Sequence, residues 1–415
     1  MVPDQRNSFN QKFSEQKYAQ LLSELNKNFV GAIDFRVAET PVFIDAHCNK
    51  QMLDTCDYII DTITHSDFQA LTDASIPANK NVPNQTAYPH FLAFDFGICM
   101  NEKNEIAPQL IEMQGFPSLY GYQVLLDDAT RTVYEIPAPF SAYYSGLNKT
   151  SYLQKLQSII VGNHNPKNVV LLEIKPHTQK TRIDFYATVA FTGVTIVCIT
   201  DIIKEGDTLF YKNSDGEKID IKRIYNRIIF DELDQMPSEI REAGRILFEN
   251  LNVEWAGHPN WFYRISKYTM PLLQHPNIPT SYYVNELVSI PEDLENYVLK
   301  PLFSFAGAGV IIDVTNNDIE SLPDPANWML QKKVNYAPII KTPTTPAKVE
   351  IRLLYLWEDG AARPFPAINI ARLSKGKMIG VRYNQNETWV GGSIAYAPTT
   401  SYITNGEGSS NTSHK

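Results

Sequence analysis

Residues 296–312 constrain the fold of this chain more than any other stretch. Their sequence predicts a short strand at 297–299, a loop of small residues, and a second strand at 310–312. Such a unit is a hairpin, and its loop is rich in residues without bulky side chains.

Lys300 and two glycines also suit this loop to an anion. Gly307 and Gly309 can adopt backbone angles that bring amide N–H groups close to an anion with no Cβ in the way. Lys300, at the end of the first strand, can bring an ammonium to the same place. A G-x-G with one lysine is a weak motif, so by itself an ordinary hairpin with a surface lysine is the better interpretation. Residues elsewhere in the chain decide between an anion-binding loop and an ordinary hairpin.

The composition indicates a chain with a sizeable hydrophobic core. Of 415 residues, 43% are hydrophobic and 20% are charged, which predicts about two or three subdomains. The 22 tyrosines and 26 prolines favour a mixed α/β chain over a helical bundle. A net charge of −9 disfavours a nucleic acid or an anionic membrane as partner, and no signal peptide or membrane span is apparent. The four scattered cysteines are expected to be free thiols, so we expect a soluble, cytoplasmic protein.

Hydrophobic periodicity predicts two regions of regular structure before the lysine loop. The first has helices at 8–30, 50–72 and 119–126, short strands at 34–37 and 41–44, and a hairpin with strands at 91–98 and 108–114. The second has a continuous apolar strand at 168–174, a helix at 179–191, a strand at 195–199, a hairpin at 207–221 and a strand at 224–230. This β-α-β pattern is Rossmann-like but lacks the G-x-G-x-x-G fingerprint, which makes it a poor candidate for dinucleotide binding.

The rest of the chain is predicted to alternate between short helices and strands. Helices are expected at 237–250 and 267–273, and strands at 327–334, 348–357, 365–373 and 376–382. The Ser/Asn/Gly-rich tail, 400–415, is expected to be disordered.

Several residues from 300 onward resemble, in their order, the signature of the ATP-grasp family: Lys300 before the glycine loop, a strand ending in Gln331, Glu350-x-Arg352, and Arg372 followed by Gly391-Gly392. In that family two α+β lobes clamp ATP between them. The last part of the signature, an Asp on one strand and Glu-x-Asn on the next, is missing from the C-terminal end.

A similar arrangement stands near the other end of the chain. Asp95 lies on one strand of the predicted hairpin, and Glu112 and Gln114 lie on its neighbour, where alternation puts them on one face. These hard oxygen ligands suit Mg²⁺ bound together with phosphates. The chain therefore resembles a circularly permuted ATP-grasp protein of the glutathionylspermidine synthase-like group of carboxylate–amine ligases. The segment 169–227 is similar to the Rossmann-like domain that precedes the ATP lobes in that group.

The resemblance implies a role for each group of residues. ATP and Mg²⁺ are the expected cofactors, with Asp95, Glu112 and Gln114 as metal ligands and Arg352, Arg372 and Lys300 as catalytic residues. ATP contacts are expected from Lys300, Ser304, Gly307, Ala308, Gly309, Gln331, Lys332, Val334 and Lys267. For Lys267 the alternative of a helix-surface lysine is slightly favoured over a nucleotide contact. Arg352 fits equally well a structural ion pair with Glu350 or Asp359. Arg36 and Arg227 are candidates to bind a substrate carboxylate.

The expected division of the chain follows from the same resemblance. It runs through an N-terminal helical, substrate-side segment (1–90), the permuted metal-binding hairpin (91–150), the Rossmann-like domain (151–235), the lobe with the glycine loop (236–330), the second lobe (331–399) and the tail (400–415).

Three functions stay open at this stage. The first is an ATP- and Mg²⁺-dependent ligase that joins a small-molecule carboxylate to an amine through an acylphosphate. The second is a phosphotransferase on the same scaffold. The third is a nucleotide-binding or interaction protein without turnover. Two departures from the family favour the third: Gln114 replaces an Asn, and Lys332 stands where an acidic residue is frequent.

Overall fold

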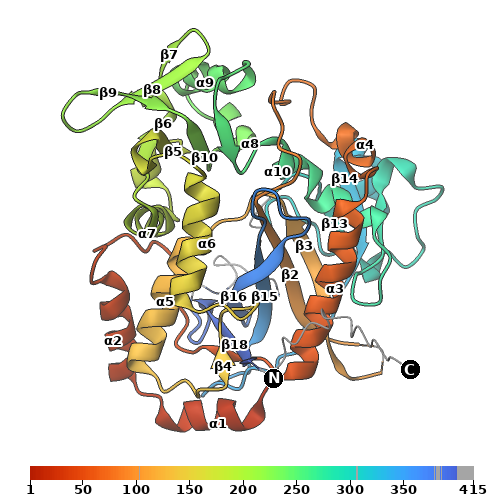
Figure 1. Ribbon diagram of the computed structural model, residues 1–415. Helices are drawn as coiled ribbons and strands as arrows, with labels where there is room; N and C mark the ends of the chain where they lie inside the picture. The colour runs from red at the N-terminus through yellow and green to blue at the C-terminus, as the bar shows by residue number, and fades with distance from the viewer. Residues whose placement is uncertain (102, 305–306, 378, 380–383, 385, 400–415) are drawn as a thin grey trace, which may run out of the picture.

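Two segments far apart in the sequence share the central sheet of the protein (Figure 1). The computed structural model describes residues 1–101, 103–304, 307–377, 379, 384 and 386–399. The five-stranded antiparallel sheet has the order β17–β16–β15–β2–β3. Its strands are β2 (Phe91–Met100), β3 (Ile106–Gln114), β15 (Lys348–Leu356), β16 (Phe365–Ser374) and β17 (Gly391–Ser393). The predicted hairpin is confirmed, and it lies directly against β15.

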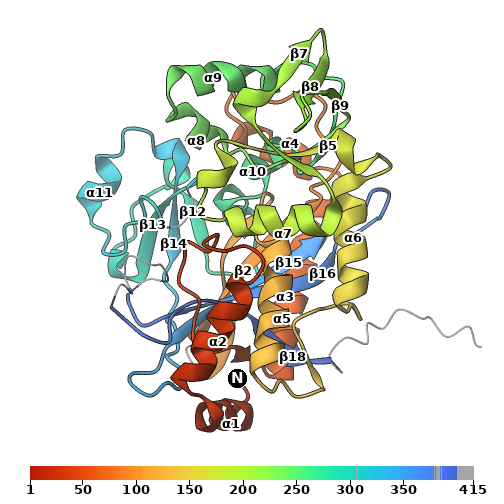
Figure 2. The ribbon, with the colours of Figure 1, turned by 90° about the vertical axis from the view of Figure 1, so that its left-hand side faces the viewer.

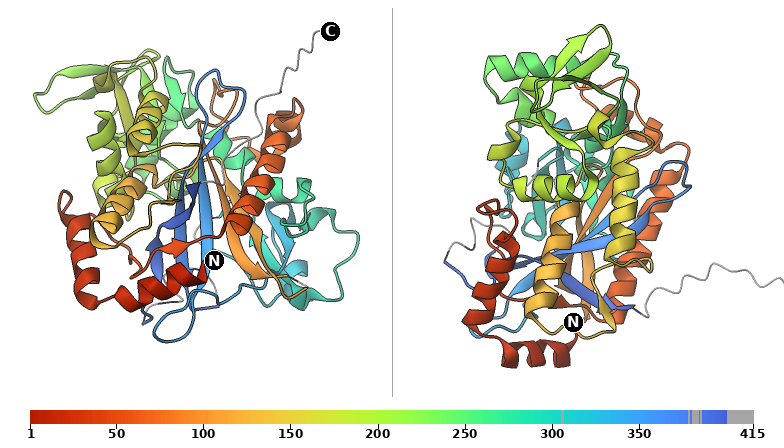
Figure 3. Two further views of the ribbon diagram at one scale, coloured as in Figure 1. Left: turned by 60° about the horizontal axis from the view of Figure 1, so that its bottom comes forward. Right: turned by 60° about the vertical axis from the view of Figure 1, so that its left-hand side comes forward.

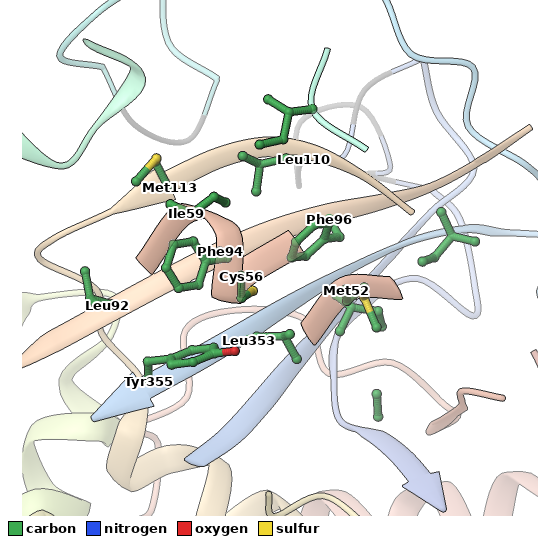
Figure 4. Packing of buried hydrophobic residues seen from close by; sticks show 14 of the residues in the cluster. Met52, Cys56, Ile59, Leu92, Phe94, Phe96, Leu110, Met113, Leu353 and Tyr355 are labelled. Atoms are coloured by element: carbon green, nitrogen blue, oxygen red, sulfur yellow. The ribbon is translucent and has the colours of Figure 1, made fainter. Parts of the chain in front are cut away.

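Strand alternation separates the two faces of this sheet. Leu92, Phe94 and Phe96 pack against α3 (Ala46–Thr64), whose Met52 and Cys56 are fully buried (Figure 4). This face belongs to the largest cluster of buried hydrophobic residues in the described chain. Burying an apolar side chain of this size contributes about 1.5–3 kcal/mol. On the other face, one end is covered by α5 (Tyr120–Val133) and the rest carries charged residues.

A four-stranded parallel sheet lies beside this layer (Figure 2). Its order is β11–β10–β5–β6, formed by β5 (Val169–Glu173), β6 (Thr195–Cys198), β10 (Arg223–Asn226) and β11 (Glu254–Ala256). Each residue of β5 is buried, since α6 (Lys149–Val161) packs on one face, and β8 with the segment around α9 packs on the other. The predicted apolar strand is confirmed. The strand expected at 224–230 ends at Asn226, and α8 (Phe230–Asp234) begins where the strand was expected to finish.

Three small antiparallel or mixed sheets complete the fold (Figure 3). The first sheet contains β7 (Ile203–Glu205), β8 (Thr208–Lys212) and β9 (Lys218–Ile221). The second contains β12 (Ser281–Tyr283), β14 (Trp328–Lys332) and β13 (Tyr297–Pro301). The third contains β1 (Val42–Phe43), β18 (Ala395–Pro398) and β4 (Phe140–Ser141). The second strand expected at 310–312 is wrong: its only pairing in the described chain is a single bridge between Leu299 and Ile311.

Several helices are shorter than predicted. The helix expected at 8–30 is two helices, α1 (Pro3–Lys12) and α2 (Glu15–Asn26), because the Ser14 side chain accepts a hydrogen bond from the Lys17 amide and starts a new helix. The other described α-helices are α4 (Phe68–Thr72), α7 (Arg182–Thr192), α9 (Ser238–Gly244), α10 (Asn260–Arg264) and α11 (Asn316–Glu320). The segment expected as a helix at 267–273 is a 3-10 turn over Lys267–Leu272 that contains Pro271.

Two predictions fall on residues outside the described chain. The tail, 400–415, is one, and most of the strand expected at 376–382 is the other. Among the described residues, no helix is both long and apolar enough to cross a membrane.

Candidate functional site

A cavity of about 200 Å³ separates the β12–β14–β13 sheet from the charged face of the central sheet. It gathers most of the residues that the sequence assigned to ATP, together with one predicted metal ligand and one predicted catalytic arginine. They are Lys267, Lys300, Ser304, Gly307, Gln331, Lys332, Val334, Glu112 and Arg372. Ala308 and Gly309 are not among the lining residues, so their role in ATP binding stays a prediction.

Lys300 is a buried residue that lines this cavity. It lies on β13, next to β14, and its Nζ donates to Gln331 Oε1 at 2.5 Å and to the Ile111 carbonyl at 3.3 Å. Its side chain and backbone together are only 9% exposed. Burial lowers the pKa of Lys300 to about 8, although Glu112 and Glu350 act in the opposite direction. The ammonium is therefore charged at neutral pH but held in a poorly solvated place, where a bound anion would stabilise it.

Lys267 is a second buried cation in the same cavity. Its Nζ donates to the carbonyl of Ser304 and lies 3.7 Å from Glu112 Oε2. The surface interpretation of this lysine is wrong, because the 3-10 turn that carries it packs against β3 and β14 instead of projecting into solvent.

The charged face of the central sheet holds a network of three carboxylates and two arginines. Arg352 donates from Nε and Nη2 to the two oxygens of Asp95, at 2.5 and 2.6 Å. Arg372 Nη2 bridges Asp95 Oδ2, at 2.6 Å, and Glu350 Oε2, at 2.8 Å. This geometry follows from register, since Asp95 lies opposite both Arg352 on β15 and Glu112 on β3.

The structural partner of Arg352 therefore differs from the two that the sequence suggested. Arg352 pairs with Asp95 and not with Glu350 or Asp359. The Glu350 carboxylate instead binds Arg372 and the Tyr336 hydroxyl, and the Asp359 carboxylate binds His90. Arg372 lines the cavity, whereas Arg352 is not among its lining residues.

The predicted magnesium ligands do not fit a metal in this arrangement. The side chain of Asp95 is fully buried and both of its oxygens are held by guanidinium groups. Glu112 accepts a hydrogen bond from Gln114 Nε2 at 2.9 Å, so the amide presents its donor to the carboxylate. Burial acts to raise the pKa of Glu112, but Lys267, Arg352, Arg372 and Lys300 outweigh it and lower the pKa. In the described part of the chain, no group of three or more His, Cys, Asp or Glu residues is placed to hold a metal ion.

The two predicted substrate arginines do not meet. Arg36 donates from Nε to the Val390 carbonyl at 3.1 Å and lines a second cavity, which adjoins the first at Arg372. Arg227 is buried elsewhere: it donates to the Pro117 carbonyl at 2.8 Å and lies over the Phe116 ring at 4.6 Å. Arg227 therefore packs beneath the start of α5 and lines neither of these two cavities.

Some site residues escaped the sequence analysis. Glu350 was considered only as part of the Glu350-x-Arg352 motif and as a partner of Arg352, and no role in the site was assigned to it, although it lines the cavity. Tyr336, Lys333 and Lys377 were not considered as site residues. For Glu350 a signal was present, because alternation along β15 puts it on the same face as Arg352. Tyr336 follows the end of β14 in an irregular segment, where no periodicity points to the cavity.

The comparisons with known proteins concern the fold. No protein-family profile matches the chain, and no curated protein matches its sequence. Among solved structures, the chain is similar to a glutathione synthetase-like effector (GSS30) from Globodera pallida, solved in its apo form. The TM-score is 0.57, over 92% of this chain and 97% of that one, and 8% of the aligned residues are identical. At that identity the likeness shows the fold alone. The chain therefore has a mixed α+β fold similar to that of this glutathione synthetase-like effector.

Proposed function

We propose that the chain binds ATP in the Lys300 cavity and uses it to join a carboxylate to an amine. The observation that carries the proposal is the charge of this cavity. Its described lining has six basic residues and two acidic ones, a difference of four positive charges. The basic residues are Lys267, Lys300, Lys332, Lys333, Lys377 and Arg372. A concave site with this excess attracts a polyphosphate.

Apolar side chains in the same cavity suit the other half of a nucleotide. Val298, Val310, Ile312 and Val334 line it beside the lysines. A base can pack on such side chains while backbone groups near Val334 form its hydrogen bonds. The triphosphate then extends toward Lys300 and Arg372.

The proposed reaction has two steps. An oxygen of the substrate carboxylate attacks the γ-phosphorus, the bond from phosphorus to the β–γ bridging oxygen breaks, and ADP leaves with the electron pair. The amine nitrogen then attacks the acyl carbon, phosphate leaves, and the nitrogen loses a proton to solvent. The chain contributes position and charge: Lys300 and Lys267 hold the phosphates, and Arg372 faces the oxygens of the phosphoryl group in transfer.

No step is assigned to magnesium. The predicted ligands would have to exchange their arginines for the metal first, because Asp95 is held on both oxygens. This same observation favours a second candidate function, nucleotide binding without turnover, in which Arg372 and Arg352 keep the carboxylates neutralised.

We also propose that the chain is a circularly permuted ATP-grasp protein with a Rossmann-like domain before its ATP lobes. The pairing of β2 with β15, which joins the hairpin of residues 91–114 to the C-terminal strands, supports the permutation. The parallel β11–β10–β5–β6 sheet is compatible with a Rossmann-like domain before the ATP lobes.

The test is nucleotide binding by calorimetry on the wild type and on Lys300→Met. Loss of a buried, charged contact is expected to weaken ATP binding at least about tenfold, since hydrogen bonds to charged groups contribute about 1.5–3 kcal/mol. Lys204→Met is the matched control, because Lys204 lies on β7 in a surface ion pair with Glu249. No ATP binding by the wild type, or equal binding by Lys300→Met, contradicts the proposal.

Turnover separates the two candidate functions. Release of ADP that needs both an acid and an amine supports the ligase. ATP binding with no ADP release from any pair supports nucleotide binding alone, and phosphate recovered on a product supports a phosphotransferase.

A further inference from the structure

A second cavity, of about 280 Å³, adjoins the Lys300 cavity, and Arg372 lines both. The second cavity lies between β16, β17, the start of α5 and the N-terminal loop that carries Arg36. Its walls are mostly apolar, with Phe35, Leu119, Ile370 and Leu373 among them. We propose that it binds the acid substrate, and that this acid has an apolar body and an amide N–H.

The position of the carboxylate follows from charge. Arg36, Lys180 and Arg372 line the cavity, and its described lining includes no acidic side chain. Arg36 is paired with Glu39, and Arg372 with Asp95 and Glu350. Of the three cations, Arg372 is the one that lines both cavities, and its buried Nε has no hydrogen-bond partner in the described structure. A carboxylate at Arg372 lies where the two cavities meet, which is where an acid must stand to attack a phosphoryl group held beside Lys300.

The backbone amides at the start of α5 are not available to bind this carboxylate. The amides of Leu119, Gly121 and Tyr122 donate to the Asp184 carboxylate at 2.8–2.9 Å. Because these N–H groups are satisfied within the protein, the attraction for an anion in this cavity comes from its cationic side chains.

The amide donor is inferred from an orphaned acceptor. Gln123 lines the cavity, is 1% exposed, and its Oε1 has no hydrogen-bond partner in the part of the chain that the structure describes. Tyr122 also lines the cavity and is buried, and its hydroxyl likewise has no hydrogen-bond partner among the described residues. Buried polar atoms are rarely left unpaired, since each costs about 1–3 kcal/mol. A ligand N–H that donates to Gln123 Oε1 removes that cost.

The wall around Arg36 is built to be rigid. Gly392 donates its amide to the Arg36 carbonyl at 2.9 Å, and a Cβ on Gly391 would lie 2.5 Å from the same oxygen. Phe35 meets the Tyr122 ring edge-on, with 5.2 Å between the centroids. A preformed apolar wall discriminates by the shape and polarity of what it covers, so a charged or strongly polar body is expected to bind poorly.

The test uses three small acids on the intact protein, titrated by calorimetry at millimolar concentration. N-acetyl-L-phenylalanine has the carboxylate, the apolar body and the N–H; 3-phenylpropionate lacks the N–H; N-acetyl-L-glutamate has the N–H but a charged body. We expect the first acid to bind at least about fivefold more tightly than each of the others, the value of one hydrogen bond or one buried apolar group. Equal binding of all three, or a preference for the glutamate derivative, overturns the proposal.

Two variants assign the binding to this cavity. Gln123→Leu keeps the size of the side chain and is expected to abolish the advantage of N-acetyl-L-phenylalanine over 3-phenylpropionate. Thr181→Trp fills the cavity from the loop before α7 and is expected to abolish binding of both acids but not of ATP, because Thr181 does not line the Lys300 cavity. Unchanged acid binding in both variants overturns the assignment.

The identification of this ligand as a substrate rests on the proposed function, but the two fail separately. Acid binding to a protein that does not bind ATP leaves the cavity assigned and removes the ligase. ATP binding with no measurable binding of any of the three acids removes the inference and leaves the ATP site.

Discussion

If ATP binds beside Lys300 as proposed, the pKa of this lysine makes the affinity depend on pH in a way that can be calculated. Burial lowers this pKa to about 8 in the free protein, while the triphosphate adds negative charge beside the ammonium and raises it in the complex. Above pH 8 the free protein must therefore take up a proton when ATP binds. The dissociation constant is expected to grow in proportion to one plus the ratio of neutral to charged lysine, which is the inverse of the charged fraction. It gives about a tenfold weaker affinity at pH 9 than at pH 7, or about 1.4 kcal/mol.

Calorimetric titration with ATP between pH 7 and 9 measures this effect directly. Repeating each titration in two buffers of different ionisation enthalpy counts the protons taken up, which should approach one per ATP at pH 9. The terminal phosphate contributes little to this change, because a phosphate group with a second pKa near 6 is already ionised in this range.

Lys300→Arg is the matched control. A guanidinium stays charged throughout this range, so the variant should bind ATP with an affinity that barely changes from pH 7 to 9. A wild type with no pH dependence, or an equal dependence in the arginine variant, would refute the assignment of Lys300 as a buried phosphate ligand.

Three further predictions concern the residues that hold the site. Arg372→Ala leaves the buried Glu350 without its cation and is expected to cost about 3–5 kcal/mol in urea unfolding. Arg363→Ala removes only exposed ion pairs and should cost less than about 0.5 kcal/mol. Asp184→Ala leaves three backbone N–H groups at the start of α5 without their acceptor and is expected to cost about 3 kcal/mol, measured in the same way. Gly97→Ala places a Cβ 2.7 Å from the Tyr336 ring, which lines the Lys300 cavity. This variant should lose about 1–3 kcal/mol of stability and also bind ATP more weakly in calorimetry; unchanged ATP affinity would contradict the role of that ring.

Local patterns were sufficient for the elements that carry the site. The hairpin at β2 and β3, the buried strand β5 and the strand β13 with Lys300 at its end were all predictable, because alternation and apolar runs are properties of neighbouring residues. The gathering of Lys300, Gln331, Glu112 and Arg372 at one cavity was predictable only through the resemblance to ATP-grasp proteins, since no periodicity connects residues so far apart.

The ends and breaks of elements were harder to predict. The strand expected at 310–312 has the right residue types, but it makes one bridge with Leu299 where a strand needs a continuous partner. The helix expected at 8–30 is interrupted where the Ser14 side chain accepts a hydrogen bond from the Lys17 backbone amide. Hydrophobic periodicity does not detect such a local hydrogen bond.

The sequence by itself determined which residues lie on one face of each strand, and hence that Glu112 and Gln114 point to the same side. Only the tertiary structure decided what those residues meet. Asp95 lies opposite Arg352 because β2 pairs with β15 across more than half the chain, and its charge is then compensated by two arginines in place of a metal. Arg36 and Arg227, alike in sequence, are separated for the same reason: one lines a cavity beside Arg372 and the other packs under α5. Strand faces are set by the backbone of each strand, whereas strand partners and charge compensation depend on contacts between distant segments.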